Sequence, residues 1–245
     1  MKGNDDDQGA WGGAGSQRYP HAEAALRPAS TPEWAERRRL STAMRTVIED
    51  LVRTEAPAED LARAADALEA VAASLSRHPK RTGLEGYGES ANAGDIHALF
   101  DYSPVIGRCN PLAPPLELRA VDSRVKGRGM FGAAYEGPPR HVHGGMVAAA
   151  FDEVLGFAQS LTGAPGMTAM LTVRYRRPTP LGKELAIDAG VDRVDGRKIH
   201  ASASISCDGQ VTAEAEGLFI SVRREKFLDM LGGDDGGDDG GAAEK

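Results

Sequence analysis

Apolar side chains in the first third of the chain recur every three or four positions, in two separate segments. Residues 30–54 form the first segment, and the second begins at Pro57. This spacing is typical of amphipathic helices, and Ser30 with Glu33 makes a capping box for the first of them. We therefore expect a helical hairpin over residues 30–78 that packs on something else and has a structural or interfacial role rather than a catalytic one. The apolar positions are Leu40, Met44, Val47, Ile48 and Leu51 in the first helix, and Leu61, Ala65, Leu68, Val71, Ala72 and Leu75 in the second.

A different pattern begins at residue 114 and is mainly that of β-strands. Alternation up to Gly137 predicts one or two strands with a turn at Lys126 and Gly127. A helical segment follows within residues 140–159, and after it come four alternating segments, separated in two places by Asp-Gly, a strong hairpin signal. The alternating segments are residues 167–178, 183–194, 197–207 and 210–222. The pattern predicts an α+β fold in which an antiparallel sheet wraps one long central helix.

The rest of the chain divides by composition. Residues 1–28 are acidic and rich in glycine, residues 231–245 are rich in Gly and Asp, and we expect both ends to be disordered because they have little apolar surface to bury. Residues 79–113 are rich in Gly, Pro, Asn and Ser, which predicts a long connection on the surface of the following domain. The sheet and its helix then form one domain over residues 114–224, which the hairpin of residues 30–78 precedes.

The predicted central helix is apolar on nearly every face but carries two neighbouring acids, Asp152 and Glu153. Its main apolar stripe is Val147, Phe151, Val154, Leu155 and Ala158. Neighbouring helix residues point about 100° apart, so no more than one of the two acids has to be buried. A buried carboxylate without a partner is costly. Either both acids lie on a narrow solvent-facing stripe, or one of them is kept inside the protein for a chemical task.

Gly144 and Gly145 stand where this helix begins. Glycine lets another group approach the backbone closely, and the first amide groups of a helix have no partner within the helix. Such an N-terminus can stabilise a developing oxyanion. Asp152 lies about two turns further along, so it faces broadly the same side as Gly144. An oxyanion donor and a carboxylate base on one side of a helix are half of a hydrolytic site.

His141 and His143 precede the glycines and allow two interpretations. An H-x-H pair on an extended segment can chelate a metal, but the sequence has no third and fourth ligand at a recognisable spacing, so we expect no metal. His143 then orients the loop or hydrogen-bonds the substrate. A serine nucleophile is not indicated because the G-x-S-x-G motif is absent, and neither Cys109 nor Cys207 has a nearby histidine in the sequence.

Composition narrows the function classes. The 245 residues are 41% hydrophobic, enough for a packed core, and the formal net charge of −7 gives no electrostatic reason to expect a nucleic acid partner. No stretch approaches the roughly 18 consecutive apolar residues of a membrane span, and the N-terminus lacks the pattern of a signal peptide. The two cysteines lie far apart, outside any C-x-x-C spacing. We therefore expect a cytoplasmic protein with no disulfide framework.

Three motifs carry a family resemblance: HGGMVAAAFDEVLG at residues 143–156, TAMLTVRYRRPTPLG at 168–182 and EAEGLFISV at 214–222. Together they resemble the hotdog-fold acyl-CoA thioesterases of the PaaI-like branch of the 4-hydroxybenzoyl-CoA thioesterase superfamily. The resemblance covers about residues 100–224, and the predicted hairpin lies outside it. It implies a hotdog fold and an enzyme that hydrolyses an acyl-CoA to the free acid and CoA, without a metal or a redox cofactor.

The resemblance also assigns residues. The family's catalytic acid corresponds to Asp152, and its oxyanion-hole amide corresponds to Gly144, with Gly145 next to it. A hydroxyl that the opposing subunit brings to the acid corresponds to Thr168. The resemblance further implies that the phosphates of CoA meet basic side chains on the sheet, although each such side chain also fits an ordinary solvated strand face. The candidates are Arg174, Arg176, Arg177, Arg197 and Lys198.

Two other functions fit part of the pattern. A non-catalytic hotdog protein that binds an acyl ligand does not need Asp152, Gly144 and Thr168 together. A hotdog hydratase or dehydratase uses a catalytic histidine with an acid on other motifs. The acyl-CoA thioesterase is therefore the function that we expect. We expect it as a homodimer or homotetramer, because one sheet cannot cover a helix that is apolar on nearly every face.

Overall fold

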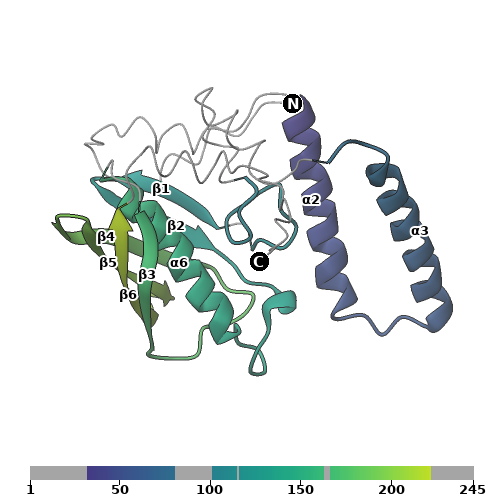
Figure 1. Ribbon diagram of the computed structural model, residues 1–245. Coiled ribbons are helices and arrows are strands. Elements are labelled where there is room, and N and C mark those ends of the chain that lie inside the picture. Colours follow the sequence, from purple (N-terminus) through teal and green to yellow (C-terminus); the bar gives the residue numbers. More distant parts are fainter. Residues whose placement is uncertain (1–31, 81–100, 115, 163–165, 222–245) are drawn as a thin grey trace, which may run out of the picture.

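The computed structural model describes residues 32–80, 101–114, 116–162 and 166–221. Six strands form one antiparallel sheet in the order β1-β2-β4-β5-β6-β3, and one long helix, α6 (Gly144–Ser160), packs on one face of it (Figure 1). The strands are β1 Glu117–Val121, β2 Arg124–Gly129, β3 Gly166–Tyr175, β4 Leu185–Asp195, β5 Lys198–Cys207 and β6 Gln210–Ser221. The predicted α+β fold, an antiparallel sheet around one central helix, is confirmed.

The sheet presents an apolar face to α6 because its strands alternate. In β5 every second residue from Ile199 to Cys207 is buried, and the residues between them are more exposed. The predicted apolar stripe of α6 meets this face, and each of its five residues is at most 1% exposed. Burial of a Leu or Phe side chain of this kind contributes about 1.5–3 kcal/mol. The apolar stripe therefore holds α6 on the sheet along most of its length.

Two hairpin turns lie at the predicted Asp-Gly pairs. Their glycines, Gly196 and Gly209, have φ angles of 59° and 73°. The turn between β1 and β2 was predicted at Lys126 and Gly127, and this prediction is wrong. The chain turns at Asp122 and Ser123, with φ angles of 47° and 63°. Gly127 lies within β2, where a Cβ atom would collide with the side chain of Leu118 on β1. This glycine serves close packing between two strands and not a turn.

The predicted hairpin is present as α2 (Pro32–Leu51) and α3 (Ala58–Ser76), on the α6 side of the sheet (Figure 1). Ser30 of the predicted capping box lies outside the described residues. The apolar stripes of the two helices do not pack on the rest of the same chain. The apolar stripe of α2 stays largely at the surface, and every residue of α3 is exposed.

Polar side chains hold α2 to the rest of the protein. Arg38 forms an ion pair with Asp101, in which both side chains are largely buried. About three turns further along, the carboxylate of Glu49 accepts hydrogen bonds from the first N–H groups of the short 3-10 helix η2 (Ala133–Tyr135), at 2.9 and 3.3 Å. The ion pair of Arg38 and the hydrogen bonds of Glu49 to the start of η2 therefore hold α2 in place. The apolar stripe of α2 takes no part in these contacts.

Residues 101–113 form a compact loop between α2 and α6. The hydroxyl oxygen of Ser103 accepts two backbone N–H groups of the loop, at 3.1 and 3.2 Å. Arg45 of α2 donates to two carbonyl oxygens of the loop, at 3.0 and 3.3 Å. Val105 and Ala113 are buried, and Val105 belongs to the hydrophobic core. This part of the predicted connection therefore reaches into the domain instead of running over its surface.

The two ends that were predicted to be disordered, residues 1–28 and 231–245, lie outside the described residues. Within the described ranges, no helix is both long enough and apolar enough to cross a membrane.

Candidate functional site

The structure brings Asp152 and Thr168 together within one chain. Asp152 is on α6, and Thr168 is near the start of β3, the edge strand beside it. The Thr168 hydroxyl donates a hydrogen bond of 2.9 Å from Oγ1 to Oδ1 of Asp152. Thr168 faces α6 because it pairs with Phe219 of β6, which is buried in the core. The expectation that this hydroxyl comes from an opposing subunit is therefore wrong, because β3 supplies it to the helix of its own chain.

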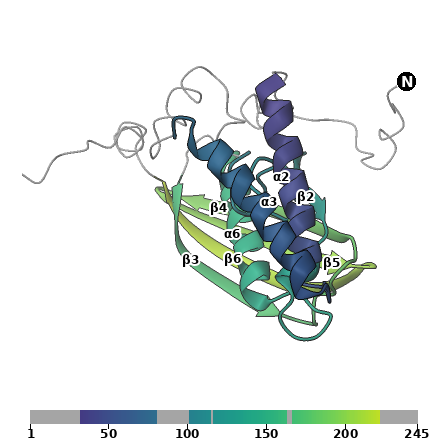
Figure 2. The same ribbon diagram turned by 90° about the vertical axis from the view of Figure 1, so that its right-hand side faces the viewer.

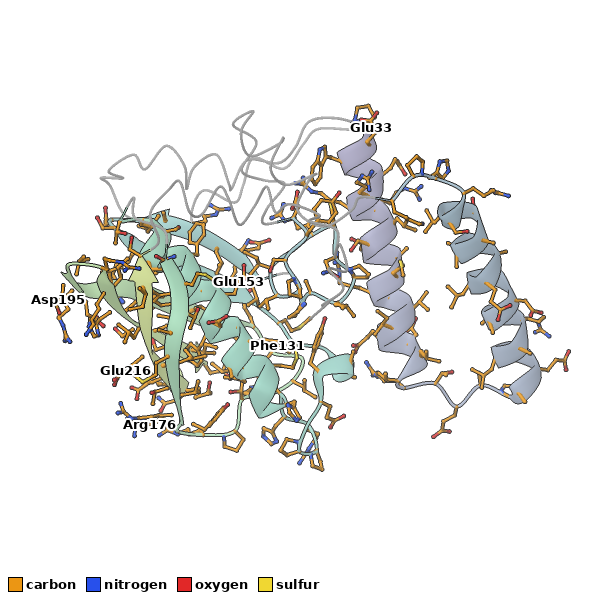
Figure 3. The ribbon with its side chains drawn as sticks, viewed as in Figure 1. Glu33, Phe131, Glu153, Arg176, Asp195 and Glu216 are labelled. Carbon is orange, nitrogen blue, oxygen red and sulfur yellow. The ribbon has the colours of Figure 1, made fainter. Side chains whose placement is uncertain are left out.

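The two acids of α6 have different surroundings. Asp152 is exposed, and Glu153 is half-buried on the side of α6 toward the loop and α2 (Figure 3). Burial raises the pKa of Glu153, a hydrogen bond with Ser103 opposes this shift, and the charge of Asp152 adds to it, so that the net shift is upward. Asp152 was expected to be the buried acid. In the single chain it is the surface acid, because the loop of residues 101–113 covers its neighbour.

The start of α6 is capped by His143. The Gly145 N–H donates a hydrogen bond of 3.0 Å to Nδ1 of His143, which occupies the N-cap position. This bond requires Nδ1 to be unprotonated, so in the neutral ring the proton is on Nε2. The amide of Gly145 is thus engaged. The N–H of Gly144 makes no hydrogen bond to any residue that the structure describes, and it is the amide at this N-terminus that is open to a ligand.

The open amide of Gly144 and the carboxylate of Asp152 lie two turns apart on α6. Gly144 and Asp152 are eight residues apart, which at 1.5 Å per residue is about 12 Å along the helix axis. A base and an oxyanion donor must each come within about 3 Å of the reacting group. One chain alone therefore cannot place both groups on a single carbonyl. The sequence predicted that the amide of Gly144 and the carboxylate of Asp152 act on one side of the helix. Within one chain these two groups are too far apart to act on the same carbonyl.

His141 contacts the backbone of its own loop. Its Nδ1 is 2.9 Å from the carbonyl oxygen of Pro139, so this ring nitrogen donates. Among the residues that the structure describes, no three His, Cys, Asp or Glu side chains gather into a group that could hold a metal ion.

Two of the predicted CoA-binding residues, Arg174 and Arg176, pair with acids on the face of the sheet away from α6. Their partners are Glu216 and Glu214 of β6, at 2.6 and 2.7 Å (Figure 3). Arg174 also lines a polar pocket of about 350 Å³ on this outer face. The structure does not bring these two arginines to Asp152 of the same chain.

A third candidate, Arg177, donates a hydrogen bond of 3.2 Å to the carbonyl oxygen of Val211. The last two, Arg197 and Lys198, lie at the turn into β5, at the same end of the sheet as Thr168. Ile199 and Thr168 both pair with Phe219, from either side of β6. Two strand spacings, roughly 10 Å, therefore separate this turn from Thr168. Lys198 points to the outer face because its neighbour Ile199 is buried in the core. Arg197 is at the turn itself and is exposed.

Two residues of this region were not singled out from the sequence. The Tyr175 hydroxyl donates a hydrogen bond of 2.8 Å to the carbonyl oxygen of Gly144, so it ties the end of β3 to the start of α6. The alternation of side chains along β3 places Tyr175 on the face toward α6, so the sequence pattern could have pointed to this residue. Ser103 lies close to Glu153 in the folded chain, but the two residues are far apart in the sequence and no sequence pattern connects them.

Comparison with known proteins identifies the family. The family model of the thioesterase superfamily matches residues 140–214, which include Asp152 and Thr168. The crystal structure of a thioesterase superfamily protein is similar over 79% of this chain and 93% of its own, with 36% sequence identity and a TM-score of 0.68. This chain belongs to the thioesterase superfamily. The hotdog fold that the three motifs implied is thereby confirmed.

The similarity to that thioesterase superfamily structure extends to residues before 81. Residues 81–245 are 165 of the 245 residues, about 67% of the chain. The match covers 79% of the chain, so part of it must fall before residue 81. At least some of the chain that precedes the hotdog domain is therefore shared with this other member of the thioesterase superfamily.

Curated relatives match a shorter part of this thioesterase superfamily chain. Acyl-coenzyme A thioesterase THEM4 of Xenopus laevis is 39% identical over 93 residues, and its counterpart in Bos taurus is 37% identical over 97 residues. These matches cover 37% and 39% of this chain. The chain spans about two fifths of the length of these relatives, 42% and 40%.

Proposed function

We propose that this protein hydrolyses the thioester of a fatty or aryl acyl-CoA to the free acid and CoA. The observation that carries the proposal is the hydrogen bond from Thr168 to Asp152, because it holds a carboxylate in a fixed orientation at the exposed edge of the sheet. Relatives that are 39% and 37% identical are named acyl-coenzyme A thioesterases, which supports acyl-CoA as the substrate.

Asp152 is the catalytic group in this proposal. It either takes a proton from a water molecule that attacks the thioester carbonyl, or attacks that carbonyl itself. Thr168 donates to one carboxylate oxygen and so turns the other toward the substrate. The C–S bond then breaks and the thiolate of CoA leaves. If Asp152 has attacked the carbonyl itself, a mixed anhydride remains on its side chain, and a water molecule hydrolyses this anhydride to release the free acid. A thiolate is a good leaving group, so the reaction does not need a strong acid beside the sulfur.

The oxyanion donor is the Gly144 N–H of a second copy of the chain. Within one chain this amide is about 12 Å along the helix from Asp152, too far to act on the same carbonyl. A second copy whose α6 runs antiparallel to the first brings its own Gly144 toward Asp152. Each site then combines Asp152 and Thr168 from one chain with Gly144 from the other, and a homodimer is the smallest active assembly.

The edge of β3 supports the position of that second copy. β3 ends the strand order, so one side of it has no neighbouring strand in the sheet. Met167 and Met170 on this strand are 56% and 55% exposed. An exposed apolar edge strand tends to pair with another chain. Antiparallel pairing of two β3 strands would cover both methionines and lay the two α6 helices side by side.

The same pairing gives a role to the basic residues. If two β3 strands run antiparallel, the end of one strand that carries Arg174 and Arg176 approaches the end of the other that carries Thr168. CoA phosphates can then meet these arginines of one copy, together with Arg197 or Lys198 of the other. The cytoplasm is the compartment that we propose, because both cysteines are free thiols, as is usual in a reducing compartment.

A thiol-release screen tests the proposal. Purified protein is offered short, medium, long and aryl acyl-CoA esters, and free CoA is measured with a thiol reagent, beside the Asp152→Asn variant as a blank. We expect release from at least one ester, and we expect this release to be lost in the variant. If all esters remain intact, or if the variant releases CoA as fast as the native protein, the proposal is wrong. Tight binding of an acyl-CoA without release would indicate a non-catalytic ligand-binding protein.

A further inference from the structure

Both helices of the hairpin keep an apolar stripe at the surface. On α2 the residues Arg38, Ser41 and Arg45 face the domain. The apolar stripe lies about a third of a turn away from them, because successive helix residues advance by about 100°. It comprises Leu40, Met44, Val47 and Leu51, which are between 37% and 59% exposed.

α3 has the sequence of a helix that packs closely on another helix. Leu61, Leu68 and Leu75 alternate with Ala65 and Ala72 at spacings of four and three residues. Such spacing forms the seam of helix bundles, in which large and small residues interdigitate. The three leucines are nevertheless 41%, 42% and 44% exposed. The α2 helix of the same chain therefore does not provide the close packing for which this seam is suited.

The place of α3 points to a second copy of the chain as its partner. In Figure 2 the C-terminal half of α3 lies on the side of α2 toward the β3 edge. A second copy stands at this edge in the proposed assembly, which would put its hairpin on the same side of the sheet as the first.

Charge selects which helices meet. Two α3 helices side by side would repel each other, because α3 carries four acids and one arginine. α2 is neutral overall and has two exposed arginines, Arg37 and Arg39, of which Arg39 pairs with Glu36 of the same helix. The α3 helix of one copy is thus better matched to α2 of the other. The charged residues of α3 are Glu59, Asp60, Asp66, Glu69 and Arg63.

We infer that the hairpin of a second copy covers these stripes, so that α3 of each copy packs along α2 of the other in a four-helix bundle. The bundle stands on the α6 side of the sheet, over the pair of central helices. Its formation requires no catalytic step, so it can be tested whether or not the protein hydrolyses acyl-CoA.

A photo-crosslink on α3 tests this inference. The residue p-benzoylphenylalanine is placed at Val71, which borders the seam and is 44% exposed. The full-length purified protein is then irradiated and analysed by denaturing gel and peptide mass spectrometry. We expect a covalent dimer whose linked peptide lies within residues 32–53 of the second copy. Links only within the same chain, including links to residues 1–31, 81–100 or 222–245, would overturn the inference, and so would a dimer linked elsewhere.

Two lysine variants provide the matched control. Leu68→Lys places a charge in the seam, and Ala70→Lys places the same charge on the opposite side of the same helix. We expect Leu68→Lys to lower the yield of covalent dimer by about tenfold, and Ala70→Lys to leave it within about twofold, because a charge is costly only where the interface excludes water. Circular dichroism confirms that both variants keep their helices. Equal yields from the two variants would contradict the bundle even if the protein is an active thioesterase.

Discussion

The hydroxyl of Thr168 donates to the carboxylate of Asp152 across 2.9 Å, from the edge strand to the central helix. Both groups belong to one chain, so the base is oriented before any second copy arrives. A hydrogen bond to a charged group contributes about 1.5–3 kcal/mol net. The bond engages Oδ1 and leaves Oδ2 to meet the water or the thioester. In the proposed site, each chain thus provides an oriented carboxylate, and a second copy provides the oxyanion donor.

Asp152→Asn tests the role of the carboxylate. The amide is nearly isosteric and can still accept from Thr168, but it can neither take a proton nor attack a carbonyl. We expect kcat for the best acyl-CoA to fall by about 10²–10⁴-fold while the thermal midpoint stays close to that of the native protein. Glu153→Gln, one residue along, is the matched control. Loss of activity in Glu153→Gln together with retention in Asp152→Asn would show that the neighbouring acid is the base.

Thr168 permits a graded test of the hydrogen bond itself. Thr168→Val keeps the shape of the side chain and removes the donor, and Thr168→Ser keeps the donor. We expect Thr168→Val to lower kcat by about 10–100-fold, in proportion to a bond of about 1.5–3 kcal/mol, with a smaller change in KM. Thr168→Ser should recover most of the rate. Equal rates in the two variants would mean that the hydroxyl does not act on Asp152.

Strongly periodic parts of the fold could be predicted from the sequence. The stripe of α6 is apolar over about three turns, and each of the two Asp-Gly pairs has a glycine that suits a positive φ angle. The turn at Asp122 and Ser123 was missed because it contains no glycine. The turn was predicted at Gly127 instead because glycine is common in turns. Here the absence of a side chain allows Leu118 of β1 to pack against the backbone. A glycine alone does not tell a turn from a close approach between strands.

Contacts between distant segments could not be predicted. The choice of Glu153 over Asp152 as the covered acid depends on Ser103, which lies about fifty residues earlier and carries no motif. The docking of α2 depends on ion pairs such as Arg38 with Asp101, which hydrophobic periodicity does not report. The pattern predicted both helices of the hairpin, but it could not say what covers their apolar stripes, which are exposed in the single chain.

Glu153 should make stability depend on pH. Its pKa is raised in the folded protein, mainly by burial, so the stability that it contributes is fully present below the pKa of the unfolded chain and is lost as the pH rises through the folded pKa. Glu153→Gln removes this loss. We therefore expect the thermal midpoint of the variant to rise relative to that of the native protein as the pH increases above the ordinary pKa of a glutamate, about 4.3. Glu184→Gln, at an exposed acid before β4, is the control. A constant difference between Glu153→Gln and the native protein at every pH would contradict this origin.

The division of the site between two copies can be tested by mixing inactive chains. Gly144→Pro removes the single open N–H and leaves the helix start in place, because proline suits the first helical position. The preceding His143 has φ −58° and ψ 131°, an extended conformation that a following proline tolerates. We expect the Gly144→Pro protein to fold and to lose about 10²–10³-fold in kcat, as for removal of an oxyanion-hole donor.

A purified heterodimer of Gly144→Pro and Asp152→Asn chains should recover activity, because one of its two sites pairs a native Asp152 with a native Gly144 from the other chain. Its rate should approach about half that of the native dimer if the sites act independently.

A heterodimer of Asp152→Asn and Thr168→Val chains should stay at or below the level of its better parent, because those two residues serve the same site from the same chain. The two chains are co-expressed with different tags, and both heterodimers are isolated by sequential affinity steps. Recovery in the second heterodimer and not in the first would place Thr168 across the interface from Asp152 and would overturn the assignment made from their hydrogen bond. No recovery in either would show that Gly144 and Asp152 do not meet across the two copies.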